Sequence, residues 1–311
     1  MESMREIKCI GMVGLGYVGG ALAAHLSRAG FELFLIDTDP NAVKRLVDSG
    51  LGKAARNLTQ LGETCDVVIT ILPSGKAVRQ VLIGEPEGEG DCVAAGLRPG
   101  TTVIDISAIA PDDTLHIEKA LEKKKVGMLD APVSGLRGGP RDAEDGSLTV
   151  MIGGDEALID HCMPIFKQIG HTVFRTGGLG TAHAAKAMSN AVFATAMLSS
   201  IEALLIAKRY GIPPKVMIEV LNASFGYNAA TNVTLPEHVL SGTYAAGFKI
   251  AYMVKDLTSA LKIAAEGGIS PPLISQVSEH WRSAMEEIGA DTDHTHLAEL
   301  WATRLGDSFN S

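Results

Sequence analysis

The sequence predicts an α/β domain with a doubly wound, mostly parallel sheet, followed by an all-α domain. Up to about residue 176, short runs rich in valine and isoleucine alternate with helical stretches. After Gly180, every periodic segment has helical spacing and a length that suits a helix. The chain has 311 residues, more than one hydrophobic core usually holds, which favours two domains. The predicted domains are residues 1–178 and residues 179–311.

The predicted strands of the first domain are short apolar runs, and the predicted helices of the second are longer periodic segments. In order, the strands read KCIGMV, ELFLID, DVVITIL, TVIDIS, KVGMLD, LTVMIG and HTVFRT. The helices are expected at 181–208, 213–223, 229–240, 249–267, 272–288 and 293–304, with stretches such as GIPP and GGISPP as stops. Strands that alternate with helices are typical of βαβ units, whose helices cover both faces of the sheet.

Charge and cysteine content exclude several classes of partner. The net charge is −9 with a pI near 5.5, and no large basic cluster is present, so neither nucleic acid nor a membrane is an expected partner. The apolar run 187–206 carries Glu202 and is interpreted as a central packing helix. The four cysteines form no CxxC pair, which predicts reduced thiols in a cytoplasmic protein and no metal site.

The stretch GLGYVG follows the first predicted strand directly and opens a predicted helix. Gly14 permits a tight turn, Gly16 lets the backbone approach a pyrophosphate, and Gly19 permits close packing of helix on strand. Tyr17 and Val18 lie in the same first helical turn, where backbone N–H groups point outward as anion donors. The motif predicts a Rossmann-like dinucleotide site made by these residues.

Three further loops follow predicted strands and are expected to contact the cofactor. Asp37 ends the second strand, 18 residues after Gly19, where a carboxylate accepts hydrogen bonds from the adenosine ribose. The same carboxylate repels a 2′-phosphate, so NAD is predicted and NADP is less favoured. Leu72, Pro73 and Ser107 follow the next strands, at the sheet edge where open α/β sheets bind ligands. An isolated serine such as Ser107 is also typical of a helix cap.

Lys186 is an unexpected charge in the stretch GTAHAAKAMSN. No charged residue follows it until Glu202, so its ammonium lies where hydration is lost on burial. A positive charge near a helix start also opposes the helix dipole, so structure alone gives little reason for it. Asn190 lies four residues later and shares its helix face. These features favour a lysine placed to exchange a proton, with a snorkelling surface lysine as the alternative.

Four motifs in order resemble the β-hydroxyacid dehydrogenases, which include the 3-hydroxyisobutyrate dehydrogenases and are similar to 6-phosphogluconate dehydrogenase. They are GLGYVG, DAPVSG with GSLTVMIGG, GTAHAAKAMSN, and GFKIAYMVKD, and the resemblance runs from about Ile7 to Leu300. It implies a Rossmann-like domain, a long central helix, and a helical domain through which a homodimer or homotetramer forms.

The resemblance also implies roles for matching residues. Ser134 and Gly135 resemble the loop that holds the substrate carboxylate. Lys186 resembles the catalytic lysine, and Asn190 its partner in holding the reacting oxygen. Lys255 resembles the lysine that closes over the nicotinamide, with its neighbouring aspartate in support; a solvated ion pair is the alternative.

Three departures from the family pattern affect the expected substrate site. Leu136 stands where the family usually has a second glycine, and an apparent insertion places Arg137 where it could bind a carboxylate or phosphate. Ala182 replaces a common glycine but leaves the lysine in register. Tyr227 precedes Asn228, a predicted substrate ligand, where some members have arginine.

The predicted function is hydride transfer between NAD and a small 3-hydroxy acid, with Lys186 as general acid and base and no metal. The first alternative is an NADP-dependent reductase of short semialdehydes or glyoxylate from the same family. An imine reductase is disfavoured because related imine reductases generally lack this lysine. A nonenzymatic NAD-sensing protein is the alternative from another class, and NADH formation with a panel of 3-hydroxy acids discriminates it.

Overall fold

The computed structural model describes residues 6–84, 90–135 and 139–309. These residues form two compact units, of which the first ends at Lys186 and the second begins at Ala187. The change of unit falls inside one helix, α9 (Thr181–Arg209). The predicted boundary between residues 178 and 179 stays a prediction, because no break in secondary structure separates the two units.

The first unit contains a nine-stranded sheet in the order β3-β2-β1-β4-β5-β6-β8-β7, with β9 paired to β8. Strands β1 to β6 pair in parallel, whereas β8 runs antiparallel to β6 and β7. The strands are β1 (Cys9–Val13), β2 (Glu32–Ile36), β3 (Lys53–Ala54), β4 (Val67–Thr70), β5 (Thr102–Asp105), β6 (Gly127–Asp130), β7 (Val133–Ser134), β8 (Thr149–Gly153) and β9 (Thr172–Gly177). All seven predicted strands are confirmed. The unpredicted strands β3 and β7 have two residues each, too few for a periodic pattern.

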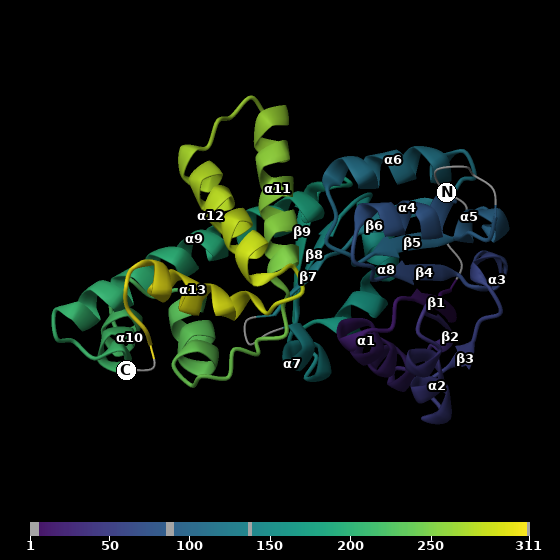
Figure 1. The fold of residues 1–311 in the computed structure, drawn as a ribbon. Coiled ribbons are helices and arrows are strands. Elements are labelled where there is room, and N and C mark those ends of the chain that lie inside the picture. The colour runs from purple at the N-terminus through teal and green to yellow at the C-terminus, as the bar shows by residue number, and fades with distance from the viewer. Residues whose placement is uncertain (1–5, 85–89, 136–138, 310–311) are drawn as a thin grey trace. The chain divides into compact units, whose positions relative to one another are not determined.

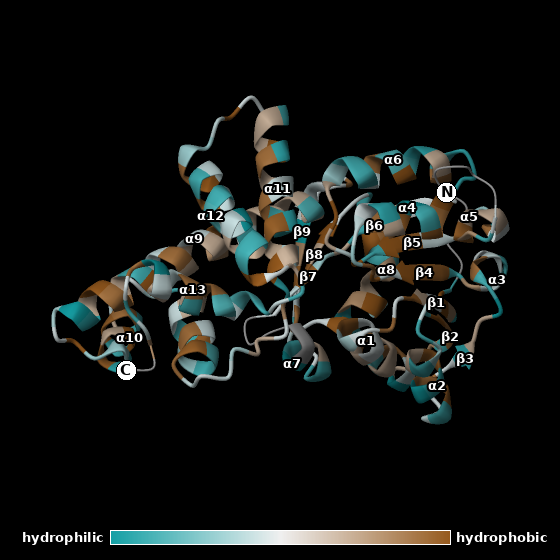
Figure 2. Cartoon of the chain, in the orientation of Figure 1, coloured by the Kyte–Doolittle hydropathy of each residue, from teal (hydrophilic) through white to brown (hydrophobic). Residues whose placement is uncertain are grey.

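Helices cover both faces of this sheet, as expected for a doubly wound fold (Figure 1). One face packs against α1 (Tyr17–Arg28), α2 (Pro40–Asp48), α7 (Gly139–Glu144) and α8 (Glu156–Ile169). The other packs against α3 (Leu58–Thr64), α4 (Gly75–Ile83), α5 (Val93–Gly96) and α6 (Pro111–Glu122). In β1, Ile10 and Met12 enter the first core while Cys9 and Val13 enter the second, because alternate side chains point to opposite faces. Figure 2 shows the buried strand β4 in brown, whereas α6 carries both teal and brown residues.

The second unit is helical and has one apolar core around α9. Its other helices are α10 (Pro214–Asn222), α11 (Ile250–Glu266), α12 (Pro272–Ile288), the 3₁₀ turn η2 (His294–His296) and α13 (Leu297–Arg304). Helix α9 is long and apolar enough to cross a membrane, but 56% of its most apolar window is buried inside the protein. Met197, Ile201 and Leu204 of α9 are fully buried in this core, as expected for a packing helix.

One predicted helix, 229–240, has a different helix type. The structure forms the π-helix η1 over Ala230–Val239, and the N–H of Leu240 bonds the carbonyl of Leu235, five residues back. Pro236 lies inside it and lacks the N–H that an α-helix would use there. The predicted helix is confirmed, and its hydrogen bonds follow the π-helical pattern.

Candidate functional site

The glycine turn between β1 and α1 fits a dinucleotide pyrophosphate. Gly14 has φ +95°, and a Cβ there would overlap the carbonyl oxygen of Ile71, so only glycine suits the position. At Gly16 a Cβ would meet nothing within 4 Å, which leaves open space beside the helix start. Gly16, the N-cap of α1, has no side chain with which to cap the helix, so the backbone N–H groups of the first turn suit an anion.

Asp37 follows β2 and is tied to the same turn. One carboxylate oxygen accepts the N–H of Leu15 at 2.5 Å, and the other accepts the N–H of Asp39 at 2.8 Å. The N–H of Gly14 also bonds the carbonyl of Ile36, the last residue of β2. The expected ribose ligand and the expected pyrophosphate turn are therefore side by side, as a dinucleotide requires.

The loops after β4 and β5 are joined through Ser107. Its hydroxyl accepts the N–H of Leu72 at 2.9 Å, and the side chain is buried. Ser107 does not cap α6, because that helix begins at Pro111 with Ala110 as its N-cap. Pro73 is exposed beside Leu72. Cofactor contacts from these three residues stay predictions, and the structure gives the Ser107 hydroxyl a role in joining the loops.

Lys186 and Ser134 come together within the first unit. The Lys186 ammonium donates to the Ser134 hydroxyl at 3.1 Å, across 52 residues of sequence. Ser134 lies on β7, paired with Thr149 of β8, so its backbone belongs to the sheet. Lys186 is half-buried on α9, which begins only five residues earlier. The expected catalytic lysine and the serine expected to hold the substrate carboxylate are therefore in contact in the structure.

The backbone of Gly135 lies so close to the Asp142 side chain that a Cβ does not fit between them. A Cβ there would overlap the carboxylate of Asp142 on α7, whose side chain is buried. Leu136 and Arg137, the departures from the family pattern, lie outside the described residues.

In the second unit, Asn190 and Lys255 are joined through Asp256 of α11. The amide of Asn190 donates to one oxygen of Asp256 at 2.6 Å, and Lys255 Nζ lies 3.7 Å from the other. Lys255 Nζ also lies 5.7 Å from the centre of the Tyr252 ring. Asp256 is buried, so it holds the amide of Asn190 in one orientation.

The Asn228 side chain already makes several hydrogen bonds within the protein. Its carbonyl oxygen accepts the N–H groups of Ala230 and Thr231, and its amide donates to Ser200 and to the carbonyl of Gly226. The side chain thus caps the start of η1. Its role as a substrate ligand stays a prediction.

Sequence reasoning missed a buried polar network beside Lys186. His183, Asp105 and Asp130 are at most 1% exposed, and His183 Nε2 and Nδ1 lie 3.8 Å from oxygens of Asp105 and Asp130 respectively. The available signal was two aspartates that each end an apolar strand, TVID and GMLD. Burying a carboxylate lowers the stability of the fold unless the carboxylate accepts hydrogen bonds. A buried aspartate at the end of a strand therefore indicates a binding or positioning role.

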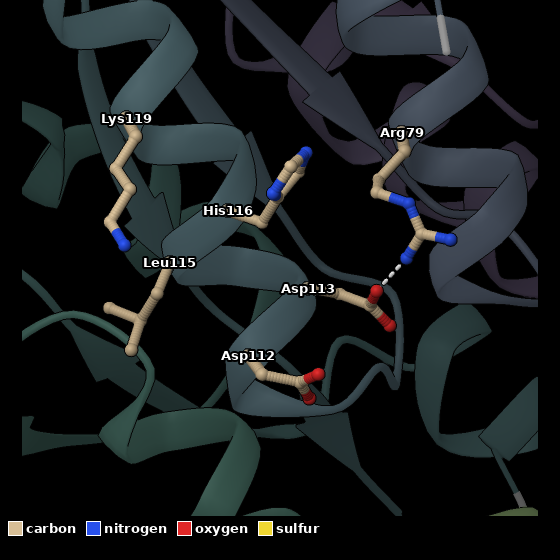
Figure 3. Close-up of a pocket in the computed structure, with 6 residues that line it drawn as sticks. All are labelled: Arg79, Asp112, Asp113, Leu115, His116 and Lys119. Atoms are coloured by element: carbon tan, nitrogen blue, oxygen red, sulfur yellow. Dashed lines mark ion pairs between the residues drawn. The ribbon is translucent and has the colours of Figure 1, made fainter. Parts of the chain in front are cut away.

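A separate depression of about 530 Å³ lies between α4 and α6 and is polar (Figure 3). Arg79 of α4 pairs with Asp113 of α6 at one side of it. Its lining residues are Arg79, Asp112, Asp113, Leu115, His116 and Lys119. None of them belongs to the predicted site.

Comparisons with known proteins identify the family of this chain. Residues 9–178 match the NAD binding domain of 6-phosphogluconate dehydrogenase, and residues 180–301 match the NAD-binding family model of NADP-dependent 3-hydroxyisobutyrate dehydrogenase. An NAD-dependent L-serine dehydrogenase of Pseudomonas aeruginosa is 32% identical over 96% of this chain and 100% of its own length. A 3-hydroxyisobutyrate dehydrogenase of the same organism is 34% identical over 85% of this chain and 88% of its own.

A crystal structure of 3-hydroxyisobutyrate dehydrogenase from Salmonella typhimurium has a TM-score of 0.81 and 28% identity. It covers 94% of this chain and 99% of its own. The matched family models, the relatives and the predicted fold all agree, and the chain therefore belongs to the β-hydroxyacid dehydrogenase family, oxidoreductases that act on CH–OH groups with NAD or NADP.

Proposed function

We propose that this enzyme oxidises a small 3-hydroxy acid with NAD, with Lys186 as the general base and, in reverse, the general acid. The hydrogen bond from Lys186 to Ser134 carries this proposal, because it joins a proton-transfer group to a predicted carboxylate ligand. L-Serine and 3-hydroxyisobutyrate, named in two relatives, both carry the hydroxyl one carbon beyond the carbon that holds the carboxylate. The product is then a semialdehyde or a 3-keto acid.

The side chains divide the work of binding and proton transfer. Ser134 accepts from Lys186, so its own O–H is left to donate to a substrate carboxylate. Lys186 Nζ takes the proton of the substrate hydroxyl during oxidation and returns it during reduction. Asn190 gives one N–H to Asp256, and its second N–H is assigned to the reacting oxygen. The nicotinamide cofactor, when bound, supplies the hydride acceptor or donor.

The test of the proton-transfer role is Lys186→Ala beside Lys186→Arg. Loss of a general acid or base typically costs about 10²- to 10⁴-fold in rate, so Lys186→Ala should lower kcat by roughly 10² or more. Lys186→Arg should be nearly as inactive, because a guanidinium stays protonated at neutral pH. Cofactor affinity and melting temperature should be retained in both variants.

Lys167→Ala is the matched control, because Lys167 is exposed on helix α8 of the same unit. Rates are measured as NADH formation at 340 nm with a panel of 3-hydroxy acids. If Lys186→Ala keeps more than about a tenth of kcat on the best substrate, Lys186 is not the acid–base group.

Asp37 supports NAD over NADP, since its carboxylate, just after β2, is bonded to the glycine turn and a carboxylate at the ribose would repel a 2′-phosphate. The unmodified enzyme should have the higher kcat/KM with NAD, and Asp37→Asn should narrow the preference. Asp39→Asn, a change in the neighbouring cap of α2, is the control and should leave the preference unchanged. A tenfold preference of the unmodified enzyme for NADP would contradict this assignment.

A homodimer or homotetramer through the helical unit is the proposed assembly. Several large apolar side chains of that unit are exposed, which is typical of a protein interface. They are Val192, Ile206, Tyr210, Val216, Val220, Phe225 and Tyr227. Light scattering should give a multiple of 32.7 kDa, and a monomer would contradict the proposal. The cytoplasm is the proposed location, supported by four buried, unpaired cysteines.

A further inference from the structure

Three neighbouring strands of the first unit end in buried polar side chains that the proposed mechanism does not use. Thr70 ends β4, Asp105 ends β5 and Asp130 ends β6, and they pair in register across the sheet. All three are 0% exposed. Burial of two carboxylates is unfavourable unless nearby donors stabilise them. The groups that donate hydrogen bonds to them therefore indicate what these carboxylates do.

Asp130 connects the two partners of the proposed catalytic contact. Its two oxygens accept the N–H groups of Gly180 and His183, both at 2.8 Å, at the start of α9. A carboxylate at this position satisfies N–H groups that a helix start leaves unbonded. Ser134 follows Asp130 by four residues along the chain. One side chain therefore joins the helix that carries Lys186 to the end of β6, which the chain leaves four residues before Ser134.

The ring of His183 ties the same helical turn to the loop after β5 and to α6. Its Nε2–H donates to the carbonyl of Ser107 at 2.8 Å, and Nδ1 lies 2.7 Å from the hydroxyl of Thr114 on α6. A carbonyl only accepts, so Nε2 must carry the hydrogen. With both nitrogens bonded and the ring 1% exposed, the first turn of α9 cannot rotate without breaking buried hydrogen bonds.

Asp105 favours the same orientation of the His183 ring. One of its oxygens accepts from the Thr70 hydroxyl and from the N–H of Ser107. Its other oxygen is buried without a hydrogen-bond partner among the described residues, 3.8 Å from His183 Nε2. At that distance the carboxylate makes no hydrogen bond, but its charge favours an N–H on the nearer ring nitrogen.

We propose that His183, held by Asp130, is a positioning residue for Lys186: its ring sets the rotation and height of the first turn of α9, and so places Lys186 Nζ against Ser134. The inference rests on the proposed acid–base role of Lys186. Lys186 is three residues beyond His183, and its long side chain amplifies a small rotation of the turn into a displacement of the ammonium. Displacements of about 1 Å at a reacting group cost as much as 10²-fold in rate.

A double-mutant cycle in kcat tests this inference. His183→Ala should lower kcat roughly tenfold to a hundredfold while KM and NADH affinity, measured by fluorescence, stay within about twofold. In a Lys186→Ala background, the same change should produce no further loss, because residues that act as a unit are not additive. His171→Ala is the control, since His171 is exposed just before β9.

Two milder variants keep the test valid if His183→Ala does not fold. His183→Gln keeps an N–H that can reach the Ser107 carbonyl and should recover part of kcat. Thr114→Val removes one ring partner with little change of shape and should lower kcat without altering NADH affinity. These variants are assayed in the same cycle.

The outcomes separate this inference from the proposed function. An equal loss of activity in the Lys186→Ala background, or an unchanged kcat in His183→Ala and Thr114→Val, overturns the positioning role. A Lys186→Ala enzyme that keeps most of its activity overturns the acid–base role instead, whatever the histidine variants do.

Discussion

Each unit buries a histidine, and the two differ in how their ring nitrogens are satisfied. In the first unit both nitrogens of His183 have polar partners. In the second unit His294 Nδ1 lies 3.1 Å from the carbonyl of Phe248, while Nε2 is buried without a partner among the described residues. His294 packs among the rings of Phe193, Phe248 and Trp281.

The difference shows two uses of the same side chain. His183 connects α9 to the sheet edge and α6, so its value lies in hydrogen bonds that fix a geometry. His294 fills an aromatic core, and burial lowers its pKa because the charged ring would lose hydration. The first histidine should matter for geometry and rate, and the second for stability at acid pH.

The largest expected effect is that of replacing Asp130, whose carboxylate accepts the backbone N–H of His183. Asp130→Ala leaves the N–H groups of Gly180 and His183 buried and unbonded, which should lower the free energy of unfolding by about 3 kcal/mol or more. Asp155→Ala is the control, because Asp155 is an exposed helix cap with one such bond and should cost about 1 kcal/mol. Urea unfolding measures both. Equal losses in the two variants would show that the strand-end carboxylate is only another cap.

A smaller effect separates residues that hold the site from residues that bind substrate. Ser134→Ala should raise KM for the acid roughly tenfold, since a hydrogen bond to a charged group contributes about 1.5–3 kcal/mol. NADH affinity and the free energy of unfolding should stay unchanged, in contrast to Asp130→Ala. Steady-state kinetics beside cofactor titration make the measurement, with Ser49→Ala on the exposed end of α2 as control. A parallel loss of cofactor affinity would assign this loop to the cofactor.

The smallest effect is the acid sensitivity of the second unit. The pKa of His294 is lowered in the folded state, so the unfolded chain binds a proton first as pH falls below about 6.5. Stability from this group is therefore complete above that pH and is lost below it, by at most about 1.4 kcal/mol per pH unit. His294→Asn should remove this slope from urea unfolding between about pH 7 and pH 5. An unchanged slope would show that His294 does not titrate differently on folding.

The two units also differ in how well they were predicted. In the first, the turn GLGYVG and the strands were predictable because glycine geometry and alternating apolar residues are local signals. In the second, helix spacing predicted every segment, but it did not specify the helix type of η1. Pro236 signals a disturbed helix, whereas the register that its neighbours then adopt depends on their packing.

By itself the sequence determined the fold class, the glycine turn and Asp37 that are predicted to bind the cofactor, and the unusual lysine at position 186. Each of these depends on residues close together in the chain, whose spacing sets their geometry. Only the tertiary structure decided what surrounds that lysine. Asp105, Asp130 and His183 are 25 to 78 residues apart in sequence. The parallel register of β5 and β6 brings the two aspartates together, and the hydrogen bonds of α9 to Asp130 and to the Ser107 carbonyl bring His183 to them. No local pattern encodes such a contact, because it depends on which strands become neighbours in the sheet.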